Sequence, residues 1–238
     1  MLVIVETTGG YIETVERIVS VFRMHYNTVE FVVPNYAYSA GTILVLSGDE
    51  IYMDYYSVLG PIDPQLEGDD GYSLPGLGYL AKYEELISLI NNPEVDPKAT
   101  RAELAYLISK FEPAKLFLIE QSIEHAQQLL RDWLPKYKFK NWIEKETSKQ
   151  PVTPEDRQRR ANEIATVLGN VQRWHSHGRG ISIRELASEE IKLKVINYGE
   201  NEDWNRNISN YYGLFIDYLG KRGFSGGLHS RRGVRRLA

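Results

Sequence analysis

The chain of 238 residues carries a net charge of −4, and 42% of its residues are hydrophobic, as is usual for a globular protein with one sizeable core. This charge gives no overall bias toward polyanions, and no apolar run approaches the ~18 residues that cross a membrane. The absence of cysteine excludes disulfides, thiolate metal ligands and a cysteine nucleophile. The first ten residues lack the basic region of a signal peptide, so we expect a cytoplasmic protein.

Strands and helices alternate over the first quarter of the chain. Residues 2–6 form a continuous β-branched run, typical of a strand buried on both faces, and residues 11–26 have the apolar spacing of a helix. Four further elements follow: a strand at 29–34, a short helix at 40–47, and short strands at 50–54 and 57–63. Because this order requires crossovers between parallel strands, the sequence predicts an α/β fold with a parallel sheet.

The second part of the chain is mostly helical. After a loop rich in glycine and proline at 63–78, Thr100 and Glu103 form a capping box that opens one helix. The other predicted helices span 79–90, 113–134, 153–168, 182–191 and 207–222.

The pattern divides the chain into a main domain at 1–196, a helical segment at 197–225 and a basic flexible tail at 226–238. The tail has four arginines and no core pattern, so we expect it to be mobile. These arginines could contact nucleic acid or an acidic partner. Since no aromatic residues are interleaved with them, we favour a solvated tail and expect no nucleic-acid partner.

Two turns marked by glycine fall where predicted strands end. The first, TTGG, ends at Gly9 and Gly10, and the second, YSAGT, contains Ser39 and Ala40. Both would lie at the carboxyl edge of a parallel sheet, where sites form in open α/β folds. A serine beside exposed backbone N–H groups is the minimum set for acyl transfer, but a serine before a helix is also a common cap. The segment is not G-x-S-x-G, since position 37 is alanine.

Residues 5–65 resemble the serine proteases of the ClpP/crotonase superfold, and most closely the serine dehydrogenase proteinase family, which is related to signal peptide peptidase A. The resemblance rests on Gly-Gly opening a helix, then YSAGT, GDEIYMD and GPIDPQ, in this order. It implies a ClpP/crotonase-like spiral of parallel β-β-α units with a mostly helical C-terminal half. It also implies a serine endopeptidase in which Ser39 is the nucleophile and the backbone N–H groups of Gly9, Gly10 and Ala40 form the oxyanion hole.

The resemblance implies a peptide or protein substrate, no metal or other cofactor, and a homo-oligomer. Self-association is also expected because the strand at 2–6 has no earlier strand to pair with, and open apolar edges invite pairing. Two of the 16 tyrosines, Tyr55 and Tyr56, belong to a group near the site that could line a peptide groove or an oligomer contact.

The general base is the least defined part of the site. ClpP uses a histidine in the segment that here reads GPIDP, whereas signal peptide peptidases use a lysine. Lys82, in GYLAKYEEL, resembles the placement of that lysine, and burial would give it the depressed pKa that a base needs. The alternatives, in order, are Lys98, Lys110, Lys115 and the His175/His177 pair, while Asp63 and His125 are disfavoured.

Two other functions compete with the peptidase. A crotonase-type enzyme acting on acyl thioesters would use the Gly-Gly turn without needing Ser39 or a lysine. A catalytically inactive scaffold or binding protein would need none of these groups.

Overall fold

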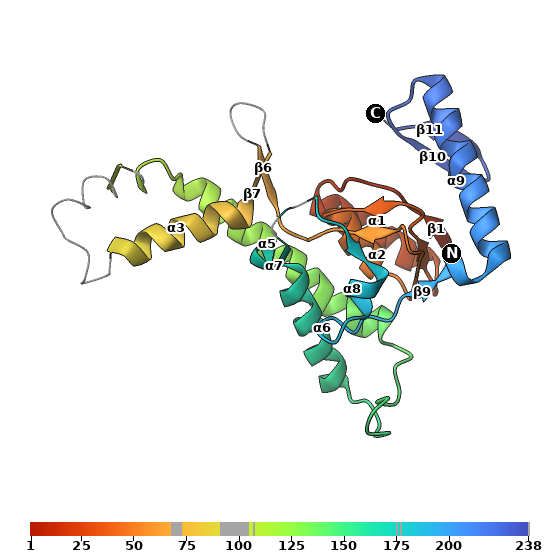
Figure 1. The fold of residues 1–238 in the computed structure, drawn as a ribbon, viewed down its shortest axis with the longest axis horizontal. Helices are drawn as coiled ribbons and strands as arrows, with labels where there is room; N and C mark the ends of the chain where they lie inside the picture. The colour runs from red at the N-terminus through yellow and green to blue at the C-terminus, as the bar shows by residue number, and fades with distance from the viewer. Residues whose placement is uncertain (68–72, 91–104, 107, 175, 177, 238) are drawn as a thin grey trace.

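The computed structural model describes residues 1–67, 73–90, 105–106, 108–174, 176 and 178–237 (Figure 1). Its main sheet is parallel, in the order β1-β2-β4-β9. The strands of this sheet are β1 (Leu2–Ile4), β2 (Glu30–Val32), β4 (Glu50–Met53) and β9 (Ile196–Asn197). The predicted α/β fold with a parallel sheet is therefore confirmed.

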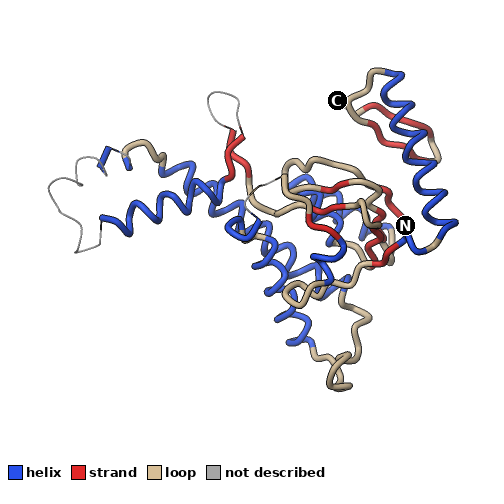
Figure 2. The backbone as a smooth tube through the Cα atoms, in the orientation of Figure 1, coloured by secondary structure: helices blue, strands red, loops and turns tan. Residues whose placement is uncertain are grey.

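A second, smaller sheet lies beside the first and holds β3 (Tyr36–Ala37), β5 (Val58–Leu59) and β8 (Ile181–Ser182). β3 and β5 are parallel, whereas β8 runs antiparallel to β5 and was not predicted. Thr7 joins the edge of this sheet through a parallel bridge to Ala37. The segments after β1, β2 and β4 therefore all enter the second sheet. Figure 2 shows the strands of both sheets gathered in one part of the molecule.

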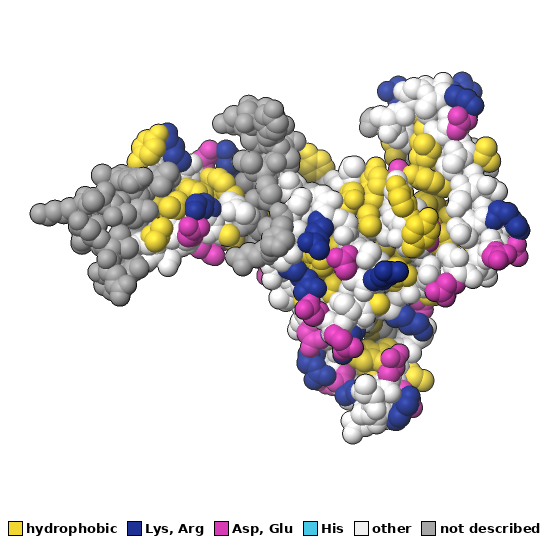
Figure 3. Space-filling view, viewed as in Figure 1, with side chains coloured by type: hydrophobic (Ala, Val, Ile, Leu, Met, Phe, Trp, Pro, Cys, Tyr) yellow, Lys and Arg dark blue, Asp and Glu magenta, His cyan; other side chains and the backbone are white. Residues whose placement is uncertain are grey.

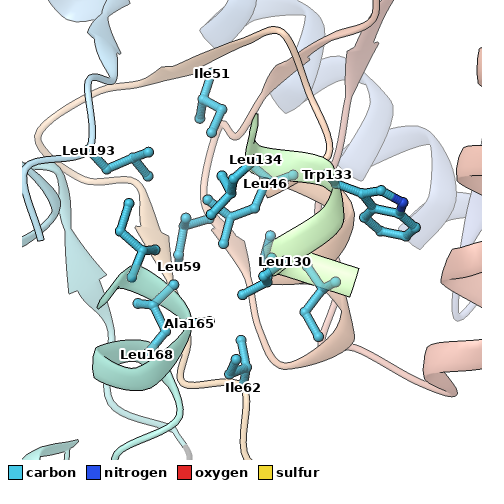
Figure 4. Close-up of a cluster of buried hydrophobic side chains, with 14 of the residues drawn as sticks. Leu46, Ile51, Leu59, Ile62, Leu130, Trp133, Leu134, Ala165, Leu168 and Leu193 are labelled. Carbon is cyan, nitrogen blue, oxygen red and sulfur yellow. The ribbon is translucent and has the colours of Figure 1, made fainter. Parts of the chain in front are cut away.

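Helices build the core around these sheets. The larger ones in this region are α1 (Ile12–His25), α2 (Ala40–Leu46), α5 (Pro113–Trp133) and α6 (Pro154–Leu168). α5 continues into the π-helical turn η1 (Leu134–Lys138), and α6 is followed by the short α7 (Val171–Trp174) and α8 (Ile183–Ala187). Figure 4 shows Leu46 of α2 beside Leu130 and Leu134, all of them fully buried. Since α2 is packed on all sides, the turn that precedes it is held firmly.

α3 (Gly76–Ile90) extends away from the sheets, next to the hairpin β6 (Gln65–Glu67) and β7 (Ser73–Pro75) (Figure 1). Tyr79 and Tyr83 of α3 pack their rings against Phe111, which precedes α5. The helix predicted at 79–90 is confirmed and begins three residues earlier, at Gly76. The predicted capping box at 100–103 lies outside the described residues.

The C-terminal part consists of η2 (Tyr198–Glu200), the long helix α9 (Glu202–Arg222) and the antiparallel hairpin β10 (Gly227–Ser230) and β11 (Gly233–Arg236). Tyr198 and Ile208 pack against Val32 of the main sheet. The hairpin falls within the tail that was expected to be mobile, and its His229 stacks on the rings of Tyr211 and Phe215 of α9. β9 crosses the domain boundary expected at residue 196, and the division itself stays a prediction.

Asp49 is a buried carboxylate at the amino end of β4. It joins α1, the residue before β2 and the segment after η1. Asp49 accepts hydrogen bonds from Arg23 of α1 at 2.6 Å, from the Val29 amide at 2.7 Å and from Lys140. Burial alone would raise the pKa of Asp49, but the hydrogen bonds from Lys140, Val29 and Arg23 outweigh it and hold this pKa below its ordinary value.

We expect Asp49→Asn to lower the free energy of unfolding by about 3 kcal/mol at pH 7, because Arg23 would lose its buried partner. A depressed pKa stabilises the fold above the unfolded value of about 3.9, and this stabilisation is lost as the pH falls through the folded value. Urea unfolding of both proteins at pH 7 and at about pH 3 measures it. The expected result is a smaller difference at the lower pH, and an equal difference would contradict this role.

Candidate functional site

Ser39 occupies a strained turn between β3 and α2. Its backbone has φ 53° and ψ −122°, and a positive φ is uncommon for any residue other than glycine. Although Ser39 stands at the N-cap position of α2, its side chain makes no capping hydrogen bond, so the cap interpretation does not explain the residue. A strained strand-to-helix turn is the device that raises a nucleophilic serine in α/β-hydrolases, and here it occurs without their sequence motif.

The Gly-Gly turn packs directly against Ser39. Thr7 aligns the two segments, because its amide donates to Tyr36 O at 3.2 Å and its carbonyl accepts from Tyr38 N at 3.0 Å. Gly9 follows with φ +112°, and a Cβ at that position would lie 2.9 Å from both Ser39 Cβ and Tyr38 O. Only glycine fits this contact, so the structure brings together the two turns that the sequence singled out.

The backbone donors beside Ser39 are not equivalent. The Gly9 amide donates to Thr7 Oγ1 at 3.1 Å, so it already has an acceptor. Within the part of the chain that the structure describes, the amides of Gly10 and Ala40 have no such acceptor. Gly10 and Ala40 are therefore the donors available to a developing oxyanion.

Thr42 supports the turn, and the sequence analysis missed it. Its buried hydroxyl accepts from the Gly60 amide at 2.9 Å and lies 2.7 Å from Ala37 O, its acceptor. These bonds fix the first turn of α2 to the ends of β3 and β5. Gly41 makes the same junction tight, since a Cβ there would lie 2.3 Å from Thr7 Cγ2. The only signal for these roles was their place in YSAGT, directly after Ser39.

Tyr212 of α9 is a second contact that the sequence analysis missed. Its hydroxyl donates to Glu6 and accepts from Asn35 Nδ2 at 3.1 Å. Burial, together with the hydrogen bond to Glu6, raises the pKa of Tyr212 to about 12. Since Glu6 precedes the Gly-Gly turn and Asn35 precedes β3, one side chain of α9 joins the two segments that lead to the site.

In the described part of the chain, no general base is hydrogen-bonded to Ser39, and its hydroxyl has no hydrogen-bond partner there. Lys82 lies on α3 with 60% of its side chain exposed and forms an ion pair with Glu85 at 2.9 Å. Lys82 is therefore not buried, as a general base was expected to be.

The alternative bases have other contacts. Lys115 pairs with Glu112 at 2.7 Å, Lys110 Nζ lies 4.9 Å from the centre of the Tyr106 ring, and His125 contacts Glu16 at 3.1 Å. Asp63 is buried and accepts a hydrogen bond from Gln65 Nε2 at 3.0 Å. Lys98, His175 and His177 lie outside the described residues.

Comparison with known proteins finds a family match over the first third of the chain. Residues 1–76 match the family model described as ClpP-like SDH-type serine proteinase, so the resemblance indicated by the sequence is confirmed over these residues. The uncharacterized proteins MJ0137 and MJ1495 of Methanocaldococcus jannaschii are similar, with 41% and 38% identity over 63 residues. Each match covers 26% of this chain and 22% of the relative, so the chain matches about a fifth of the length of either. Ser39 lies inside the matched segment and Lys82 outside it.

Proposed function

We propose that the chain is a serine endopeptidase with Ser39 as the nucleophile. The observation that carries the proposal is the positive φ of Ser39 in a turn packed against the Gly-Gly turn. The match of residues 1–76 to a serine proteinase family supports the same chemistry. A peptide or protein is then the substrate.

In the proposed reaction, Ser39 Oγ attacks the carbonyl carbon of the peptide bond while its proton passes to a base. The N–H groups of Gly10 and Ala40 stabilise the resulting oxyanion, and Gly9 can join them only by releasing Thr7 Oγ1. The tetrahedral intermediate collapses to an acyl-enzyme, and the leaving amine takes up the proton. Water then attacks the ester while the base takes one of its protons, and the base passes that proton to Ser39 Oγ as the carboxylic acid product leaves.

Lys82 remains our proposed base, supported by its position after the GPIDPQ segment. To act as the base, Lys82 has to break its ion pair with Glu85 and become buried, for example in a contact with a neighbouring subunit. Lysine must be neutral to accept a proton, so activity should rise with pH toward the alkaline range.

We expect Lys82→Met and Lys82→Arg each to lower kcat/KM by about 10²- to 10⁴-fold, because neither side chain can accept a proton at working pH. Both variants should keep the unfolding free energy within about 0.5 kcal/mol, since Lys82 is exposed. Lys221→Met is the matched control, because Lys221 is exposed and pairs with Asp217 one turn away. Wild-type turnover in Lys82→Met would move the role to the alternatives, in the order Lys98, Lys110, Lys115 and the His175/His177 pair.

We include two further features in this proposal: the spiral arrangement of the β-β-α units and a homo-oligomeric state. A ClpP/crotonase-like spiral is supported by the repeated order β1, Thr7, α1 and β2, β3, α2. A homo-oligomer is supported by the edge strand β1, whose Leu2 and Ile4 side chains are exposed. None of the helices in the described ranges has the length and hydropathy needed to cross a bilayer.

Hydrolysis of labelled casein, set beside turnover of an acyl-CoA, tests the proposal. Casein cleavage that disappears in Ser39→Ala would support it. Turnover of the thioester without casein cleavage would favour the crotonase-type alternative. Failure of both reactions in folded protein, at every oligomeric state found by light scattering, would favour the inactive scaffold.

A further inference from the structure

A pocket of about 390 Å³ opens at the carboxyl edge of the main sheet, which is where ligands bind in open α/β folds. It is lined by Asn35 after β2, Asp54 and Tyr55 after β4, Tyr198 at the end of β9 and Tyr212 of α9. Figure 3 shows hydrophobic side chains, a class that includes tyrosine, gathered where the sheet region meets α9. No residue of the proposed catalytic machinery lines this pocket.

Among the described residues that line the pocket, the only charged side chain is the carboxylate of Asp54. Asp54 is buried, and its Oδ1 accepts from the amides of Tyr56 at 2.8 Å and Ser57 at 2.9 Å, which fixes its orientation. A second carboxylate, Glu6, is not one of the lining residues, but it accepts a hydrogen bond from the hydroxyl of Tyr212, which does line the pocket. Both charges repel anions and attract cations.

Aromatic rings stand at the mouth of the pocket. Tyr55 and Tyr56 are 82% and 62% exposed, and their ring centres lie 6.5 Å apart in an edge-to-face arrangement. Rings beside a carboxylate are the surroundings that bind guanidinium and ammonium groups, because ring faces attract cations. Exposed rings also leave the entrance open to a side chain of a bound peptide.

The pocket lies close to Ser39 along the chain. Asn35 precedes Ser39 by four residues, so their Cα atoms can be no more than about 14 Å apart. An extended peptide covers that distance with about four residues. We propose that this pocket binds an arginine or lysine side chain of the substrate within about four residues of the cleaved bond; this inference rests on the proposed peptidase function.

Binding to the full-length Ser39→Ala protein tests the inference without cleavage. The probes are two dye-labelled peptides that differ only in one arginine or its uncharged analogue citrulline, followed by fluorescence anisotropy. We expect the arginine peptide to bind about tenfold more tightly. Adding Asp54→Asn should remove the preference while Asn still accepts from the Tyr56 and Ser57 amides. Asp217→Asn, an exposed position on α9, is the control and should keep it.

A second variant tests the inference if the Asp54→Asn protein does not fold. Tyr55→Leu removes an exposed ring and should lower the arginine preference about two- to fivefold. Equal affinity for the two peptides, or no binding of either, would overturn the inference. Casein hydrolysis by the wild-type protein is measured separately. A charge preference in binding without hydrolysis would reject the peptidase and leave a cation-binding pocket.

Discussion

Ser39→Ala is expected to abolish peptidase activity, with kcat/KM falling by more than about 10³-fold, and to leave the circular dichroism spectrum unchanged. Ser39→Gly should be equally inactive but more stable than Ser39→Ala by about 1 kcal/mol. The reason is that φ 53° strains any side chain at this position, whereas glycine adopts it freely. Thermal unfolding should show the difference as about 2–4 °C in Tm.

The control for this comparison is Ser122, a half-buried residue inside α5. There, glycine should be less stable than alanine by about 1 kcal/mol, the ordinary cost of glycine in a helix. The sign of the Gly/Ala difference should therefore be opposite at the two positions. If Ser39→Gly is the less stable variant, as at Ser122, the turn is not strained and the structural basis of the proposed nucleophile fails.

Gly9→Ala is expected to destabilise the protein by about 2–4 kcal/mol and to remove activity. The added Cβ would lie 2.9 Å from Ser39 Cβ and from the backbone oxygen of Tyr38, neither of which can move without displacing the turn. The φ of +112° adds strain for alanine at the same position. Urea unfolding and casein hydrolysis measure the two effects.

Gly213→Ala is the matched control, because Gly213 lies inside α9 and a Cβ there would meet nothing within 4 Å. It should raise stability by up to about 1 kcal/mol through helix propensity and leave activity unchanged. A Gly9→Ala protein with wild-type Tm and turnover would show that the Gly-Gly turn is not in tight contact with Ser39.

The sequence predicted those helices and strands whose residue pattern is recognisable within a short segment. The β-branched run before TTGG and the apolar spacing after it placed β1 and α1, and the order of elements placed the sheet as parallel. β8 and β9 have two residues each, too few for any periodicity, and their partners β5 and β4 lie more than 100 residues away. Nothing local in the sequence could predict that pairing.

For the candidate site, too, some features were predicted from the sequence and others were not. The positions of Ser39 and Gly9 follow from short motifs next to strand ends, but the backbone strain at Ser39 appears only when the two turns are packed together. Tyr212 reaches Glu6 and Asn35 from α9 across the fold, and no motif marks it. Lys82 has apolar neighbours in sequence, which suggested burial, yet Glu85 one turn later draws it into an exposed ion pair.

The most direct test of the nucleophile is labelling with a fluorophosphonate, followed by digestion and peptide mass spectrometry. These reagents phosphonylate only serines that are activated for attack. The proposed function predicts one modified peptide, with the added mass on Ser39, and no labelling of the Ser39→Ala variant. A folded protein that stays unmodified, or one that carries the label on a different serine, would contradict the assignment of Ser39.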